Sequence, residues 1–229
     1  MNPTINWLEL LIGAVLGLFT ALLVAAIYEW VRKPNLVFTI DTSPNEGERN
    51  IKGKTYQWKF INIIVENKAR PWWQTWLWGN VPAENVRVWI SFRDYESNSE
   101  QFKISARWST TSQPINVLGY PDWSSILVAS RESIPIGESA SLAAIIKTDQ
   151  SESVFAFNNE SYQYYPEYGA PFNTLWSKPE FELGSDKKFR LCVKVLAGGH
   201  EFNEEFVLLN TRKSYGSIKM LVEEADPCE

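Results

Sequence analysis

The sequence is poor in the residues from which most catalytic and metal sites are built. Its 229 residues include one histidine, His200, and two cysteines, Cys192 and Cys228. A zinc site or a Cys–His catalytic pair needs more of these side chains than the chain supplies, and no glycine-rich phosphate-binding motif is present. His200 follows two glycines in a predicted hairpin turn, where an exposed side chain is typical. We therefore expect a protein that is not an enzyme and that has no metal or cofactor.

Neither cysteine has the spacing of a disulfide framework or of a metal site. Cys192 lies in the apolar segment RLCVKVL, which predicts a buried free thiol. Neighbouring carboxylates such as Glu204 and Glu205 face opposite sides of a strand, and we expect solvated surface there rather than paired catalytic acids.

Basic residues are too few for binding to nucleic acid. The chain has 22 Lys and Arg against 27 Asp and Glu, which gives a net charge of −5. Proteins that bind nucleic acid usually present a basic patch to the phosphates. We expect no nucleic-acid partner.

One long apolar run, Leu10 to Ile27, lacks charge, amide and proline. As a helix it would be about 27 Å long, close to the ~30 Å hydrocarbon thickness of a bilayer. Aromatic residues flank it on both sides, where membrane interfaces favour them. The sequence predicts a short tail over 1–9 and a transmembrane helix with a juxtamembrane turn over 10–33. The predicted membrane-interface residues are Trp7, Tyr28, Trp30, Arg32 and Lys33.

A cleaved signal peptide is the alternative, because Val24-Ala25-Ala26 offers small residues of the kind that signal peptidase cuts. The preceding segment has no Lys or Arg, however, and the run exceeds the usual length of a signal-peptide core. The basic pair Arg32 and Lys33 predicts that the soluble domain is cytoplasmic. The tripeptide Asn159-Glu160-Ser161 is an acceptor for N-glycosylation and would suit the opposite placement.

Small residues recur every four positions within the apolar run. Gly13, Gly17, Ala21 and Ala25 therefore lie along one stripe of the predicted helix. In lipid, small residues at this spacing let a second helix approach closely. The stripe is a candidate helix-pairing face for self-association or for another membrane helix.

Residues 34–229 are dense in strand signals. The segment 86–92 alternates apolar and polar residues, and 56–66 is rich in aromatic and β-branched residues. The polar segment 43–54 between two strands predicts a turn-rich loop. Nine or ten strands without a convincing second helix indicate an all-β, antiparallel β-sandwich domain. The predicted strands are 35–42, 56–66, 86–92, 102–108, 124–129, 139–147, 153–157, 188–196, 201–209 and 218–222.

The order of these features resembles single-pass, membrane-anchored proteins with an immunoglobulin-like β-sandwich. The matching segments are the exit from the span, Arg32–Val37, the strand end Val65–Lys68, and the strand entries Pro82–Val88 and Ile134–Ala140. The resemblance implies an immunoglobulin-like antiparallel sandwich after one N-terminal transmembrane helix. It implies no activity, because members of this class mostly have no assigned function.

Two aromatic-rich insertions depart from the simplest such domains, at 71–79 and 158–184. Their aromatics could bind a ligand, enter a membrane interface or contact a partner, or they could fold back as a packed cluster. If both insertions emerge at one end of the domain, they would form a single aromatic platform. The candidate binding residues are Trp72, Trp73, Trp76, Trp78, Tyr164, Tyr165 and Tyr168.

Together these features predict a membrane-tethered, non-catalytic interaction module. Its expected partners are membrane lipid and either a protein partner or a second copy through the transmembrane helix. Two alternatives stay open: a receptor domain for a small ligand or carbohydrate, and an accessory subunit of a membrane protein complex.

Overall fold

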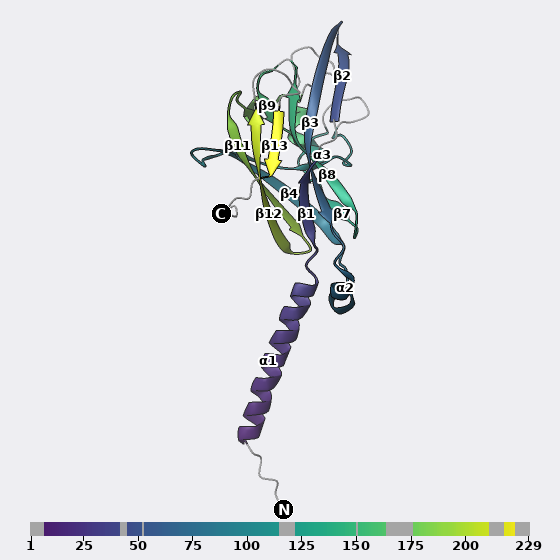
Figure 1. The fold of residues 1–229 in the computed structure, drawn as a ribbon, viewed down its shortest axis with the longest axis vertical. Helices are drawn as coiled ribbons and strands as arrows, with labels where there is room; N and C mark the ends of the chain where they lie inside the picture. The colour runs from purple at the N-terminus through teal and green to yellow at the C-terminus, as the bar shows by residue number, and fades with distance from the viewer. Residues whose placement is uncertain are drawn as a thin grey trace, which may run out of the picture.

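The structure, a computed structural model, describes residues 7–41, 45–51, 53–114, 122–149, 151–163, 176–210 and 218–222. A single long helix, α1 (Trp7–Val31), stands below a domain that is built mainly of strands (Figure 1). The helix already includes residues 7–9, which the sequence analysis placed in a tail. Residues 1–6 of that tail lie outside the described part.

The first sheet has seven antiparallel strands around a long central pair. β3 and β8 pair over most of their length, and β1 and β2 follow one another along the other edge of β3. The order is β1–β3–β8–β9–β10, with β2 beside β3 and β6 beside β8. The strands are β1 (Leu36–Ile40), β2 (Asn45–Ile51), β3 (Lys54–Asn67), β6 (Arg107–Trp108), β8 (Ser139–Thr148), β9 (Val154–Ala156) and β10 (Glu182–Leu183).

The second sheet has six antiparallel strands in the order β13–β12–β11–β4–β5, with β7 beside β4. Its strands are β4 (Ala83–Asp94), β5 (Glu100–Ser105), β7 (Glu132–Ile134), β11 (Lys188–Ala197), β12 (His200–Asn210) and β13 (Ile218–Val222). The hairpin between β11 and β12 turns on Gly198 and Gly199, which both have positive φ. The sequence analysis predicted this turn correctly, because glycine adopts positive φ without a steric penalty.

The two sheets share one hydrophobic core. Val86, Val88, Ile90 and Phe92 alternate along β4, and none is more than 1% exposed. They belong to the same packed cluster as residues of β3 and β8 in the other sheet. The predicted alternation in 86–92 is therefore confirmed: period-two burial puts every second side chain of β4 between the sheets.

The short strands β7 and β10 were not predicted, the predicted strand 102–108 is divided between β5 and β6 of different sheets, and three further segments change type. The polar segment 43–54, expected as a loop, contains strand β2, which pairs with β3 from Asn45 to Ile51. β2 lacks apolar alternation because backbone pairing to β3, rather than burial, holds it there. Gly47 is required at this pairing, because an added Cβ would lie 2.7 Å from the Trp58 ring.

The other two differences are short helices. The expected strand over 124–129 is instead the helix α3 (Trp123–Ile126), capped by Asp122, whose side chain accepts from the Ser124 amide. The tryptophan-rich insertion contains the helix α2 (Trp72–Trp78). Two 3₁₀ turns, η1 (Asn159–Gln163) and η2 (Pro179–Phe181), lie within the second insertion. Such short helices give too little periodicity to be recognised from sequence.

Candidate functional site

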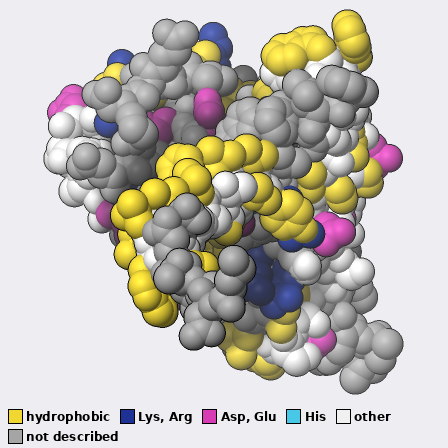
Figure 2. Space-filling view, turned by 90° about the horizontal axis from the view of Figure 1, so that it is seen from below, with side chains coloured by type: hydrophobic (Ala, Val, Ile, Leu, Met, Phe, Trp, Pro, Cys, Tyr) yellow, Lys and Arg dark blue, Asp and Glu magenta, His cyan; other side chains and the backbone are white. Residues whose placement is uncertain are grey.

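α1 is long and apolar enough to cross a membrane, and a signal sequence would pass the same test. Its segment Leu10–Glu29 has a mean hydropathy of 2.7 and none of it is buried against the rest of the molecule. Trp7 and Tyr28, near the two ends, are 75% and 55% exposed. Seen from below, apolar side chains cover the helix, and a group of Lys and Arg side chains lies beside them (Figure 2).

The residues just after the helix hold two cations close to aromatic rings. The guanidinium of Arg32 lies 4.6 Å from the centre of the Tyr28 ring, and the Lys33 ammonium lies 5.0 Å from that of Phe202 on β12. Both basic side chains are exposed. Of the other predicted interface residues, Trp30 lies on α1 with its side chain outside the described part.

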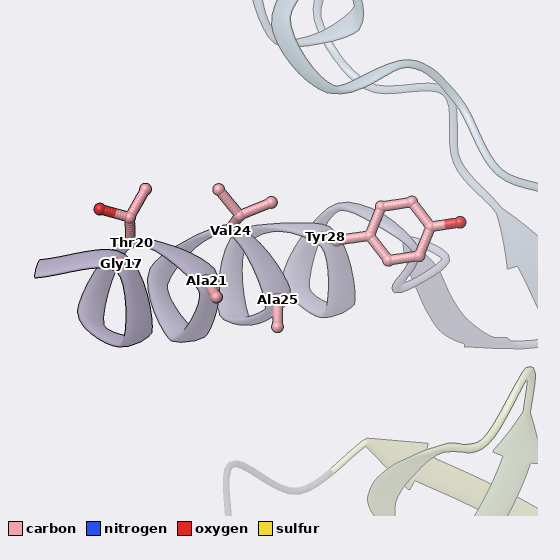
Figure 3. A pocket seen from close by; sticks show the side chains of 6 residues that line it. All are labelled: Gly17, Thr20, Ala21, Val24, Ala25 and Tyr28. Atoms are coloured by element: carbon pink, nitrogen blue, oxygen red, sulfur yellow. The ribbon is translucent and has the colours of Figure 1, made fainter. Parts of the chain in front are cut away.

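No described part of the structure packs against the glycines of the small-residue stripe on α1. A Cβ added at Gly13 or Gly17 would meet nothing within 4 Å. Gly17, Ala21 and Ala25 line a shallow hollow together with Thr20, Val24 and Tyr28, and Figure 3 shows the two alanines pointing away from Thr20 and Val24. The structure thus leaves this face of the helix open.

A short linker, residues 32–35, joins α1 to the domain. Hydrogen bonds between Asn35 and the end of β3 hold it in place. Asn35 donates its amide to Asn67 Oδ1 (3.3 Å) and its side-chain Nδ2 to the Lys68 carbonyl (3.2 Å). The Lys68 amide donates back to the Asn35 carbonyl (2.8 Å). Pro34, between the helix and Asn35, is buried. The exit from the helix is therefore part of the folded domain.

Asn67 connects the linker to two further segments, one at Val81 and one at 134–137. Its Nδ2 donates to the carbonyls of Val81 (2.9 Å) and Ile134 (3.1 Å), and its own carbonyl accepts from the Gly137 amide (2.7 Å). The residue is 1% exposed. The sequence pattern indicated only a strand end at Asn67 and predicted no such role for its side chain. The sequence signal for this role is an asparagine at the end of a strand, before a loop that contains Pro71 and Pro82.

α2 projects from the same end of the domain. In Figure 1 it lies at the level of the last turns of α1. A hydrogen bond joins the two ends of the segment that contains α2, from the Arg70 amide to Asn80 Oδ1 (3.1 Å). The Gly79 amide donates to the Thr75 carbonyl (2.8 Å) and caps the C-terminus of the helix. The Arg70 side chain reaches the linker, where Nη2 donates to the Lys33 carbonyl (2.5 Å).

The predicted binding aromatics of this insertion lie on α2. Trp72 is 83% exposed and Trp73 is 52% exposed. Trp76 and Trp78 also belong to α2, with side chains outside the described part. The two described tryptophans are therefore presented to the surroundings and are not covered by the domain.

The aromatics around the second insertion behave differently. Phe157 lies 4.9 Å from Phe60, 5.7 Å from Tyr162 and 6.1 Å from Trp176, measured between ring centres. Trp58 packs edge-on against Trp176 at 5.4 Å. We call these five residues the outer aromatic cluster. It packs with Ala143 and Ile146 and forms a second apolar cluster apart from the main core.

The outer aromatic cluster and α2 do not form one platform. Phe60 and Asn67 are separated along β3 by seven residues, which in a strand is about 23 Å, and α2 follows Asn67. The single platform considered above is therefore not formed by the described aromatics. Tyr164, Tyr165 and Tyr168, the remaining candidates, lie outside the described residues.

Arg107 is a buried cation that sequence reasoning did not single out. Its Nη1 donates to Asn159 Oδ1 (2.8 Å) and to the Ser112 carbonyl (3.2 Å), and its guanidinium lies 5.4 Å from the centre of the Tyr162 ring. Burial lowers the pKa of Arg107 and raises that of Tyr162. The arrangement ties β6 to the start of the second insertion.

Asn159 also belongs to the glycosylation tripeptide. Its Nδ2, the atom that would carry a glycan, donates to the carbonyls of Ser125 (3.3 Å) and Val128 (3.4 Å). The side chain is 8% exposed. The folded domain therefore uses this amide internally, and the tripeptide gives no support for an exported domain.

Two further expectations on β11 and β12 are wrong. Glu205 is 7% exposed and its Oε2 lies 3.7 Å from Arg190 Nε, so it is not solvated surface. Its neighbour Glu204 is half-buried, and desolvation raises its pKa. Cys192 is buried as predicted, yet it is disulfide-bonded and not a free thiol. The other cysteine, Cys228, lies outside the described residues.

Lys147 is a buried titratable group with a hydrogen-bond partner inside the domain. Among the described residues no group of three or more His, Cys, Asp and Glu side chains could hold a metal ion. Lys147 is 1% exposed, and burial lowers its pKa, but its Nζ donates to Asn210 Oδ1 (2.6 Å). Asn210 in turn donates to the Glu152 and Gly184 carbonyls, so this buried lysine connects loops.

Comparisons with known proteins add little to this geometry. No protein-family model matches the chain, and no curated protein matches it. A solved structure, described as Northeast Structural Genomics Consortium target SoR45, is similar over 83% of this chain and 88% of its own, with 7% identity and a TM-score of 0.28.

Proposed function

We propose that this protein is a membrane-tethered, non-catalytic interaction module. The observation that carries the proposal is α1, an unburied apolar helix of membrane-spanning length that is followed by a linker residue, Asn35, hydrogen-bonded into the domain. A helix with such a surface is stable in lipid and costly to expose to water. The domain would then be held at the membrane surface, where it meets its partners.

We further propose that the domain is an immunoglobulin-like sandwich. The order β1–β3–β8 in one sheet matches strands A, B and E of that fold, and β5–β4–β11–β12 in the other matches C′, C, F and G. The departure is at β8, whose next neighbour β9 follows it in the chain, whereas strand D precedes strand E.

The open stripe on α1 is the proposed helix-pairing face. Lipid tails solvate Leu as well as another Leu does, so helices in membranes associate where small residues allow close backbone contact. Gly13, Gly17, Ala21 and Ala25 satisfy that requirement. The partner is a second copy of the chain or another membrane helix.

Two features oppose each other on orientation. Arg32 and Lys33 after the helix favour the cytoplasmic side for the domain, as the sequence analysis proposed. The disulfide at Cys192 favours an oxidising compartment. Protease treatment of intact cells separates the two, because an exported domain is digested and a cytoplasmic one is protected.

The tether itself is tested by alkaline carbonate extraction of membranes that contain the full chain. We expect the intact chain to stay with the lipid pellet. A mature chain that begins after Ala26 and stays in the aqueous fraction would identify α1 as a cleaved signal and overturn the proposal.

Partner binding is tested by purification in mild detergent followed by mass spectrometry. A partner that is lost when Gly13 and Gly17 are changed to Ile would act through the helix. A partner that is retained in this variant would bind the domain. A chain that is purified alone, as a monomer, would contradict the interaction module and would leave the small-ligand receptor as the alternative.

A further inference from the structure

The first turn of α2 exposes two large apolar side chains. Trp72 and Trp73 are adjacent large aromatics, 83% and 52% exposed. The described domain offers them no cover, although it packs the tryptophans of the outer aromatic cluster at ring distances near 6 Å. Contiguous exposed apolar groups of this kind mark contact surfaces.

The position of α2 indicates what it contacts. Arg70, which precedes α2, donates from Nη2 to the carbonyl of Lys33 at 2.5 Å, only two residues after α1 ends at Val31. Figure 1 places α2 beside the upper end of α1 along the long axis of the molecule. A bilayer crossed by α1 would therefore have its surface at the level of α2.

The charges around α2 suit a phospholipid surface. From Asn67 to Ala83 the chain contains no Asp or Glu, and its charged residues are Lys68 and Arg70. Arg32 and Lys33 add two basic residues at the same end. Basic side chains are attracted to lipid phosphates, and Trp favours the headgroup level of a bilayer.

α2 is already folded by hydrogen bonds within its own segment. The bond from the Arg70 amide to Asn80 Oδ1 closes its base, and Thr75 Oγ1 donates to the Arg70 carbonyl (3.1 Å). Gly79 ends the helix with φ of 68°, a conformation that glycine adopts easily. A segment that is already folded loses little conformational entropy on binding.

We propose that α2 is a second membrane contact, in which Trp72 and Trp73 enter the headgroup region of the bilayer that α1 spans. This inference rests on the proposed membrane tether. Together, α1 and α2 give the domain two points of attachment, and two points fix its orientation on the membrane.

The experiment uses the full chain in vesicles of phosphatidylcholine and phosphatidylglycerol, with and without brominated lipid. Bromine quenches the emission of tryptophans that touch lipid. We expect W72A/W73A to lose part of the quenched emission of the wild type. The matched control is W123A, because Trp123 is 59% exposed but lies on α3, farther from α1 (Figure 1). W123A should lose only unquenched emission.

The possible results separate the two proposals. If brominated lipid quenches no emission in the wild type or in any variant, all of which keep Trp7 on α1, then α1 is not in the bilayer and the tether fails. If W72A/W73A keeps all the quenched emission of the wild type while the tether holds, α2 does not touch lipid and the inference is overturned in favour of a protein partner. Should the double alanine variant not fold, W72F/W73F removes the same emission with apolar area retained, and the same loss is expected.

Discussion

Tryptophan is used in opposite ways at the two aromatic-rich regions of this molecule. In the outer aromatic cluster, Trp176 packs against the rings of Trp58, Phe60 and Tyr162. On α2, Trp72 and Trp73 are exposed. Both regions are rich in aromatic residues, so aromatic content alone does not tell a packed ring from an exposed one. The decisive difference is whether an adjacent sheet face is available to cover the rings.

The largest effect is expected from removing a ring of the outer aromatic cluster. Phe157 is 3% exposed and touches Phe60, Tyr162 and Trp176. Phe157→Ala should lower the free energy of unfolding by about 3–5 kcal/mol, as buried Phe→Ala changes do. Urea unfolding of the full chain in detergent measures this. Trp123→Ala is the exposed control and should stay within about 0.5 kcal/mol of the wild type; equal losses in both would contradict the comparison.

The next effect concerns the polar centre near α2. Asn67→Ala leaves the carbonyls of Val81 and Ile134 without their Asn67 partner inside the protein. We expect a loss of about 2–4 kcal/mol in the free energy of unfolding. The control is Asn203→Ala on β12, an exposed residue whose side chain donates to Glu201. An Asn67 variant as stable as that control would show that the centre contributes no stability.

How far the sequence predicted these regions depends on the kind of signal. The alternation of Val86, Val88, Ile90 and Phe92 predicted a strand with one buried face, and this is confirmed. The hairpin turn at Gly198-Gly199 could also be predicted, because glycine adopts the positive φ that tight turns need. β2 was missed because its seven residues, NEGERNI, carry no apolar pattern and are held by pairing to β3. Local patterns report burial, and they do not report backbone pairing between distant segments.

The candidate sites show the same limit. The positions of Trp72 and Trp73 on a loop between strands could be predicted, but their exposure could not, because it depends on where the sheets end. Asn67 and Arg107 were missed for a related reason: each is a single polar residue whose partners come from segments far apart in the chain. The apolar run that became α1 was the clearest prediction, since its signal lies within one segment.

A smaller effect is expected at the contact between α2 and the linker. Arg70→Ala removes the bond from Nη2 to the Lys33 carbonyl and should cost about 1 kcal/mol locally. Hydrogen exchange of the Arg32, Lys33 and Asn35 amides should become faster, with exchange in β3 and β8 unchanged. Arg131→Ala, at an exposed arginine of another loop, is the control. Unchanged exchange at 32–35 in the Arg70 variant would mean that α2 and the linker are independent.

The smallest effect is a pH dependence at β12. Desolvation raises the pKa of Glu204 above its ordinary value of 4.5. The native state therefore binds the proton more tightly than the unfolded state, and Glu204 reduces stability once the pH exceeds its native pKa. As the pH falls from there towards 4.5, this penalty disappears.

Glu204→Gln should therefore be slightly more stable than the wild type at neutral pH, with the difference vanishing near pH 4.5. Glu201 provides the matched opposite, because the Lys194 ammonium and Asn203 lower its pKa. Glu201→Gln should be less stable at neutral pH, and that loss should disappear as the pH falls below 4.5 through the lowered native pKa. Unfolding midpoints measured from neutral pH to well below pH 4.5 follow both. Parallel profiles for the two variants would contradict the assigned burial of Glu204.

The joint at Asn35 has a mechanical consequence. Only residues 32–35 separate α1 from β1, and Asn35 in this linker is hydrogen-bonded to Asn67 and Lys68. No slack peptide is left to absorb motion, so a turn of the helix about its own axis is passed on to β1 and, through its pairing, to β3. We therefore expect α1 and the β-sheet domain to rotate together as one body.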